Sequence, residues 1–81
     1  MNKNTINIGI IGLGNIGSNL YKYIQRNQKK IHNLTGKYIK IKYVSAKNFR
    51  KKRDIKINKK MWVKNPFKII KKDVDIIIEL I

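Results

Sequence analysis

The sequence predicts an α/β fold with a doubly wound parallel β-sheet that residues 1–81 leave incomplete. Three observations predict it. An apolar run at residues 6–11 leads directly into a glycine-rich turn, and a helical pattern follows that turn. A second strand-like run ends near Ala46, and a third apolar run begins at Val74. The expected order is β-α-β-β-α-β, and right-handed crossovers would place the strands side by side in one sheet.

The first predicted strand, residues 6–11, is apolar except for Asn7, which is typical of a strand covered by helices on both faces. A helix is expected from residue 15 to about residue 34, with Gly36 as its terminator. Its core-facing stripe is expected to comprise Ile16, Leu20, Tyr23, Ile24, Asn27, Ile31 and Leu34. We interpret His32, near the end of this helix, as solvated or capping rather than catalytic, because no carboxylate stands nearby in the sequence.

Residues 38–46 alternate in polarity and predict the second strand. Residues 47–60 are strongly basic and are expected to form a mobile surface loop, after which residues 61–63 could add a small strand. Asn65 and Pro66 have the form of a helix start, with an N-cap followed by proline at the first helical position. The residues that this short helix would bury are Phe67, Ile69 and Ile70.

We expect the short helix to end near Lys72 and the last apolar run, residues 74–81, to form a buried parallel strand. Residues 76–78 would lie at an unfinished sheet edge, which is an aggregation hazard. The carboxyl ends of parallel strands meet at one edge of a sheet, where ligands of such sheets bind. This edge would bring together residues 12–17, 45–47 and 80–81.

The glycine-rich turn at that edge reads Gly12-Leu13-Gly14-Asn15-Ile16-Gly17. The spacing GxGxxG between a strand and a helix is that of a dinucleotide-binding turn, which makes the predicted sheet a partial Rossmann-type one. Gly12 would allow the tight turn, Gly14 would let backbone approach a pyrophosphate, and Gly17 would let the helix pack closely on the strand. The phosphates would sit at the helix N-terminus, where unpaired N–H groups favour an anion. A tight turn that binds nothing is the alternative.

The end of the second strand bears on which dinucleotide would bind. NAD-binding sites commonly place an acidic residue there, against the ribose 2′-hydroxyl. Here Ser45, Ala46 and Lys47 occupy this place, so a cation stands where a 2′-phosphate would lie. Electrostatics therefore favours NADP over NAD, with NAD left open. The alternative for Lys47 is composition bias, because lysine is abundant throughout the chain.

Length and composition restrict the classes of function. Eighty-one residues hold one small domain, so we expect the N-terminal part of a dinucleotide-binding domain, with the substrate and catalytic domain absent. The lack of cysteine excludes disulfides, thiolate catalysis and zinc–thiolate sites, and fits a cytoplasmic protein. No uninterrupted apolar run is long enough to cross a bilayer, and no metal site is expected.

The net charge of +16 has two interpretations. A basic surface attracts phosphate backbones and is typical of a nucleic-acid-binding module. However, Ile and Asn are enriched together with Lys, as an A/T-rich coding sequence would produce, and Arg is scarce. We favour composition bias and expect no specific nucleic-acid partner, although non-specific binding to polyanions is expected in vitro.

Several separated segments resemble the N-terminal part of homoserine dehydrogenase, in the same order and at similar spacing. They are residues 8–17, 44–47, 62–66 and 74–81. The first motif is shared by many dehydrogenases, whereas the last, Val74-Asp75-Ile76-Ile77-Ile78-Glu79-Leu80-Ile81, is much more particular. In that family it runs into a Gly-Gly pair, and this chain stops just before that pair would come.

The resemblance implies a family that oxidises L-homoserine to L-aspartate 4-semialdehyde with NAD(P), in the route to threonine and methionine, and whose full-length members are homo-oligomers. It implies cofactor contacts by Gly12, Leu13, Gly14, Asn15, Ile16, Gly17, Ala46 and Lys47, the last at the 2′-phosphate. Asn15 and Ile16 depart mildly from the family's usual residues, which leaves backbone contacts intact but puts any side-chain hydroxyl contact in doubt.

The family's catalytic lysine and acidic residues lie beyond residue 81. We therefore expect no catalytic residue in this chain, no homoserine binding without the missing domain and no activity of the chain alone. Glu79 matches the family's motif, and at the end of a buried strand it is better suited to orient backbone or water than to act as an acid or base. A different NAD(P)-dependent dehydrogenase is the alternative, and a basic nucleic-acid-binding module is a less favoured one.

Overall fold

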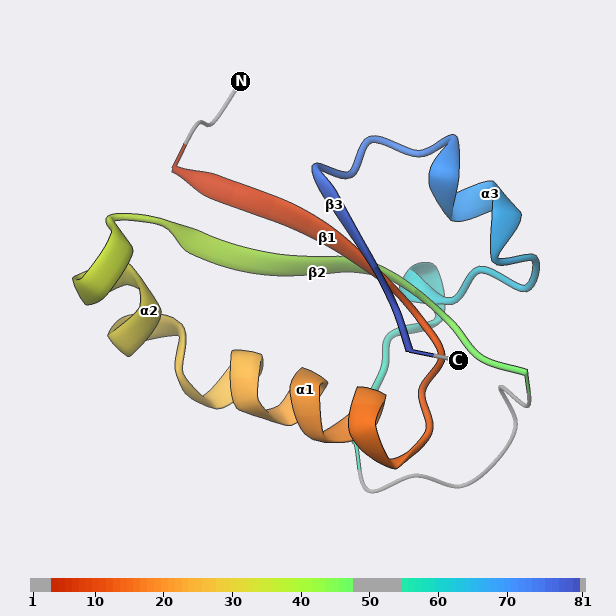
Figure 1. Ribbon diagram of the computed structural model, residues 1–81, viewed down its shortest axis with the longest axis horizontal. Coiled ribbons are helices and arrows are strands. Elements are labelled where there is room, and N and C mark those ends of the chain that lie inside the picture. Colours follow the sequence, from red (N-terminus) through yellow and green to blue (C-terminus); the bar gives the residue numbers. More distant parts are fainter. Residues whose placement is uncertain (1–3, 48–54, 81) are drawn as a thin grey trace.

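The computed structural model describes residues 4–47 and 55–80. The elements follow in the order β1 (Thr5–Ile11), α1 (Asn15–Arg26), α2 (Gln28–Thr35), β2 (Tyr38–Ser45), the 3₁₀ turn η1 (Lys59–Met61), α3 (Phe67–Ile70) and β3 (Ile76–Glu79). The central strand β1 pairs in parallel with both neighbours, so the strand order is β2-β1-β3 (Figure 1). The predicted α/β class and the parallel, incomplete sheet are confirmed.

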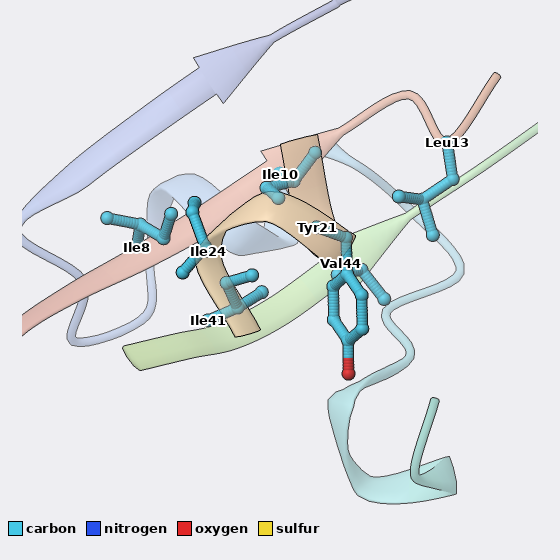
Figure 2. Packing of buried hydrophobic residues seen from close by; sticks show 7 residues of the cluster. All are labelled: Ile8, Ile10, Leu13, Tyr21, Ile24, Ile41 and Val44. Atoms are coloured by element: carbon cyan, nitrogen blue, oxygen red, sulfur yellow. The ribbon is translucent and has the colours of Figure 1, made fainter. Parts of the chain in front are cut away.

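Apolar clusters lie on both faces of this sheet. The larger cluster joins β1 and β2 to α1 and consists of Ile8, Ile10, Leu13, Tyr21, Ile24, Ile41 and Val44 (Figure 2). The smaller cluster joins Ile11 to Val63 and to Ile69 of α3. Figure 1 shows α1 and α2 on one side of the sheet and α3 on the other, which is the doubly wound arrangement. Gly9 lets α3 approach β1, because a Cβ there would lie 2.6 Å from Cγ2 of Ile69.

The single helix expected over residues 15–34 is two helices that meet at Asn27. The Asn27 side-chain amide donates a hydrogen bond to the carbonyl of Tyr23 (2.7 Å), which the Asn27 N–H also contacts (3.0 Å). Asparagine side chains compete in this way for backbone partners and so favour helix ends. The next residue, Gln28, then ties the start of α2 to the backbone of Ile39 in β2.

The face of α1 that packs on the sheet also differs from the predicted stripe. Gly17, Tyr21 and Ile24 are buried, whereas Ile16 and Tyr23 are exposed. Leu34, in α2, is exposed as well, so these three residues are corrected from core to surface. Gly17 lies against the backbone of Gly12, just after β1. Residues three or four positions apart share a face of a helix, so the buried face runs from Gly17 through Tyr21 and Ile24.

Residues 61–63 form one isolated parallel bridge, between Val44 and Trp62, rather than a strand. Residues 48–54 of the expected loop lie outside the described residues. Ile55 and Ile57, on the described part, are half-buried and pack against the larger cluster. This part of the segment is therefore attached to the core and not a free surface loop.

α3 begins at Phe67 with Pro66 in the N-cap position, one residue later than predicted, although Asn65 still bonds to the start of the helix. The side-chain oxygen of Asn65 accepts a hydrogen bond from the Phe67 N–H (3.0 Å), as an N-cap does. Of the three residues expected in the core, only Ile69 is buried, while Phe67 and Ile70 are exposed. The helix ends at Ile70 and is too short for more than one of its side chains to reach the sheet.

β3 is confirmed as a parallel strand at a sheet edge, but it is shorter than expected and is not buried. Ile76 and Ile77 are exposed, and Ile78 is half-buried against the larger cluster. An edge position leaves one long side of a strand without a neighbour, so an interior composition does not produce an interior burial. Residue 81 lies outside the described part of the chain.

Candidate functional site

The carboxyl ends of the three strands meet around Ile11, the last residue of β1. Ile11 is in register with Ser45 at the end of β2 and with Glu79 at the end of β3. The Gly12 N–H donates to the Ser45 carbonyl (2.8 Å), and the Leu80 N–H donates to the Ile11 carbonyl (2.8 Å). The segments expected to converge at this edge therefore do so, as far as residue 80.

Two glycines of the turn are required by the fold itself. Gly12 has φ = 100°, in the left-handed region that side chains other than glycine rarely adopt. Gly17 lies against the backbone of Gly12: an added Cβ would be 2.1 Å from the Gly12 oxygen and 3.1 Å from its carbonyl carbon. The turn can close back onto α1 only because both positions lack a side chain.

Gly14 is different, because nothing in the folded chain requires glycine there. Its φ of −74° is ordinary for any residue, and an added Cβ would meet no atom within 4 Å. Gly14 is the N-cap of α1, and it provides no side-chain hydrogen bond to the helix. The space in front of this N-cap is therefore open, beside backbone N–H groups that have no partner within a helix.

The electrostatics at this helix start favour an anion. No acidic residue lies in the first turn of α1. The positive end of the helix dipole and the N–H groups of the first turn therefore meet no carboxylate from that turn itself. A phosphate group placed in the open space beside Gly14 would fit both the geometry and the charge of this end of α1.

The other predicted site residues fall into two groups. Asn15 and Ile16 are exposed, so their side chains are available at the turn. The Leu13 side chain is buried in the larger cluster, which leaves only its backbone for a ligand. Beyond β2, Ala46 is half-buried and Lys47 is exposed. No carboxylate follows β2 at this point, and Glu79, at the end of β3, is exposed.

Tyr21 is a residue near this edge that the sequence interpretation missed. Its ring is buried beside Val44, and its hydroxyl donates to the carbonyl of Lys56 (3.1 Å), which fastens the segment after residue 54 to α1 (Figure 2). The available signal was helical spacing from Gly17, four residues earlier. His32 stacks on Tyr38 with ring centroids 4.1 Å apart, and Tyr38 pairs with Thr5 at the opposite end of the sheet.

Within residues 4–47 and 55–80, no helix has both the length and the apolar character needed to cross a membrane. Within the same ranges, no three His, Asp or Glu side chains gather where they could hold a metal ion.

Comparison with known proteins gives sequence relatives along nearly the whole chain, although no family model matches it. The chain is 36% identical over 77 residues to homoserine dehydrogenase of Bacillus subtilis and 33% identical over 76 residues to that of Neisseria gonorrhoeae. These matches cover 94% and 93% of the chain but only 18% and 17% of the relatives. The chain thus spans about a fifth of their length.

Solved structures give the same result. A crystal structure of Staphylococcus aureus homoserine dehydrogenase at pH 7.5 superposes with a TM-score of 0.82 and 33% identity, over 93% of this chain and 20% of the other. The structure of the same enzyme at pH 7.0 gives a TM-score of 0.81. The resemblance seen in the motifs is confirmed: in sequence and in fold, the chain is similar to the N-terminal part of homoserine dehydrogenases.

Proposed function

We propose that residues 1–81 form the N-terminal part of a dinucleotide-binding domain and bind a nicotinamide dinucleotide at the turn from Gly12 to Gly17. The observation that carries this proposal is the contrast among the three glycines. Gly12 and Gly17 are explained by backbone geometry, while Gly14 faces open space at the start of α1. A glycine that the fold does not need is explained by a ligand whose phosphates approach the backbone closely.

Different groups at this edge would contact different parts of the cofactor. Backbone N–H groups at the start of α1 would bind the pyrophosphate, with Leu13 contributing backbone only. Asn15 and Ile16 would flank the adjacent ribose. The bound nicotinamide would supply hydride transfer, and the chain's own part is to hold and orient the dinucleotide.

We further propose that the preferred cofactor is NADP. Ser45, Ala46 and Lys47 place no carboxylate after β2, and the exposed Lys47 is a cation that suits a 2′-phosphate. Lysine would act as a point charge, without the bidentate geometry of arginine. Its contribution is therefore one of charge attraction rather than of shape recognition.

For the whole protein we propose the activity of its relatives, the interconversion of homoserine and aspartate 4-semialdehyde in a cytoplasmic homo-oligomer. None of the residues in this chain is assigned to catalysis, so the 81-residue chain is expected to bind cofactor without transferring hydride. Turnover of homoserine by this chain alone would contradict that expectation.

The test uses Trp62, the one tryptophan in the sequence, which bridges to Val44 just before the end of β2. NADPH, NADH and a short DNA duplex are titrated at low and at high salt while Trp62 fluorescence is followed. Saturable binding of NADPH that is lost in Gly14→Val supports the proposal. Binding of the duplex alone, abolished by salt, would identify the chain as a basic nucleic-acid-binding module instead.

A further inference from the structure

Tyr21 joins two parts of the molecule that are far apart in the sequence. Its ring is 6% exposed and lies beside Val44 in the larger cluster, and its hydroxyl lies at the end of the ring away from the other labelled side chains (Figure 2). That hydroxyl donates to the carbonyl of Lys56 (3.1 Å), 35 positions later in the chain. A phenylalanine would fill the same space in the cluster, so packing alone does not account for the hydroxyl group.

The hydroxyl holds the start of residues 55–63, the connecting segment. The first four residues of this segment belong to neither a helix nor a strand. Ile55 and Ile57 pack against the larger cluster, but apolar contacts are not directional and do not fix where along α1 the segment lies. The hydrogen bond to the Lys56 carbonyl is directional, so it does fix that position.

The connecting segment is fastened to β2 at its other end. Trp62 bridges to Val44, and the Val63 N–H donates to the Val44 carbonyl (2.9 Å). The segment therefore runs from α1 to β2. These are the two elements whose ends flank the proposed cofactor site, because Gly14 is the N-cap of α1 and Lys47 follows the carboxyl end of β2.

This placement relates the connecting segment to one half of a bound dinucleotide. In dinucleotide-binding folds the pyrophosphate lies at the helix N-terminus and the adenosine ribose lies at the end of the second strand. An adenosine bound in this way would lie between the glycine turn and Lys47. Ala46 and Ile55 pack on the same apolar cluster that contains Leu13, so the connecting segment borders this space.

We propose that Tyr21 is a positioning residue of the cofactor site: through the Lys56 carbonyl, its hydroxyl holds the connecting segment where it borders the adenosine half of the dinucleotide. This inference rests on the proposed function. Without the hydrogen bond the binding-competent position of the segment is less populated, and apparent affinity falls in proportion to that population. NADPH and NADH share the adenosine group, so both lose affinity equally.

Tyr21→Phe removes the hydroxyl and keeps the ring in the cluster. Isothermal titration calorimetry should show NADPH and NADH each binding about fivefold more weakly, as expected for losing one hydrogen bond that holds the segment. Tyr23→Phe is the matched control, because it removes the same atom from a ring on α1 that is 54% exposed, and it should leave both affinities unchanged. Circular dichroism checks that both variants are folded. Unchanged affinity in Tyr21→Phe, or an equal loss in Tyr23→Phe, would overturn the proposal.

Trypsin digestion gives a second measurement, because the carbonyl that Tyr21 holds belongs to the peptide bond after Lys56, where trypsin cleaves. Early cleavage at this bond, quantified by mass spectrometry, should be about fivefold faster in Tyr21→Phe, since proteolysis follows the population of the released segment. In the unmodified chain, NADPH should slow it. Faster cleavage without weaker binding, or no protection by NADPH, would reject the positioning role.

The two proposals fail in different ways. If the unmodified chain binds neither NADPH nor NADH, the proposed function is rejected, and the role of Tyr21 is rejected with it. If the unmodified chain binds both and Tyr21→Phe binds them as tightly, the cofactor site stands and only the role of Tyr21 is rejected.

Discussion

The backbone carbonyl of Gly12 lies so close to Gly17 that a Cβ on residue 17 would stand 2.1 Å from its oxygen. This contact joins the end of the central strand to the first turn of α1. Because the Gly12 oxygen belongs to the backbone, no rotation of a side chain can relieve the overlap. The structure of the turn therefore depends on glycine at position 17 whether or not a ligand is bound.

Gly17→Ala should consequently destabilise the fold. Relief of the overlap requires the turn or α1 to shift, and overpacking of this kind costs about 1–3 kcal/mol. Urea unfolding followed by circular dichroism measures this loss in the absence of any nucleotide. An unfolding midpoint equal to that of the unmodified chain would show that the turn is not fixed by this contact.

Gly14→Ala is the matched substitution at the open position, and it should separate binding from folding. Alanine is a poorer N-cap than glycine, but it also restricts the unfolded chain, so the free energy of unfolding should change by less than about 1 kcal/mol. NADPH affinity should fall by at least about tenfold, because the added methyl group occupies the space beside the helix N-terminus. Unaltered NADPH affinity would argue against phosphate binding at Gly14.

Lys47→Ala tests the cofactor preference, with Lys40→Ala as a control of equal charge change. Both lysines are exposed, but only Lys47 follows the carboxyl end of β2. Loss of one exposed charge pair costs about 1 kcal/mol, so Lys47→Ala should weaken NADPH binding about fivefold and leave NADH binding unchanged. If Lys40→Ala lowers the NADPH to NADH affinity ratio equally, the preference comes from overall charge.

The strands and the glycine turn could be predicted from the sequence because each has a strong local signal. The run at β1, the alternation at β2 and the motif from Gly12 to Gly17 depend on neighbours in the sequence. The break at Asn27 and the role of Tyr21 could not be predicted in the same way. They depend on where Gln28 meets β2 and where the Tyr21 hydroxyl meets Lys56, which are contacts between distant segments.

Burial in the second half was predicted less well, for a related reason. An apolar sequence shows that a residue can be buried, whereas its actual burial depends on what packs against it. Phe67, Ile70, Ile76 and Ile77 are exposed because no described element covers that part of the sheet and of α3. Leu13 and Lys47 show the same limit. Their places in the sequence gave no indication that the Leu13 side chain would be buried in the larger cluster or that the Lys47 side chain would be exposed.

Ile69→Ala and Ile70→Ala form a test of this corrected packing. Ile69, in α3, is 0% exposed. Truncating a fully buried isoleucine costs about 2–5 kcal/mol through lost burial and the cavity left behind. Ile70 is 59% exposed, and its truncation should change the free energy of unfolding by no more than about 0.5 kcal/mol. Thermal unfolding of the two variants compares them directly. Similar losses in both would mean that α3 buries the face predicted from the sequence.

The ion pair between Lys42 in β2 and Asp73 before β3 gives the fold a pH dependence whose sign is fixed. The hydrogen bond from Lys42 lowers the pKa of Asp73 below its ordinary value of 3.8, and the same bond raises the pKa of Lys42 above 10.5. The pair therefore stabilises the fold between these ordinary values. Its contribution is lost as the pH falls through the lowered pKa of Asp73, or rises through the raised pKa of Lys42.

Asp73→Asn should accordingly have a slightly lower urea midpoint than the unmodified chain at neutral pH, since an exposed pair contributes little. The two midpoints should converge below the pKa of Asp73, where residue 73 is uncharged in both proteins. They should also converge in about 1 M salt, where charges are screened beyond about 3 Å. A difference that persists in acid would show that the effect of Asp73→Asn does not come from the charge of residue 73.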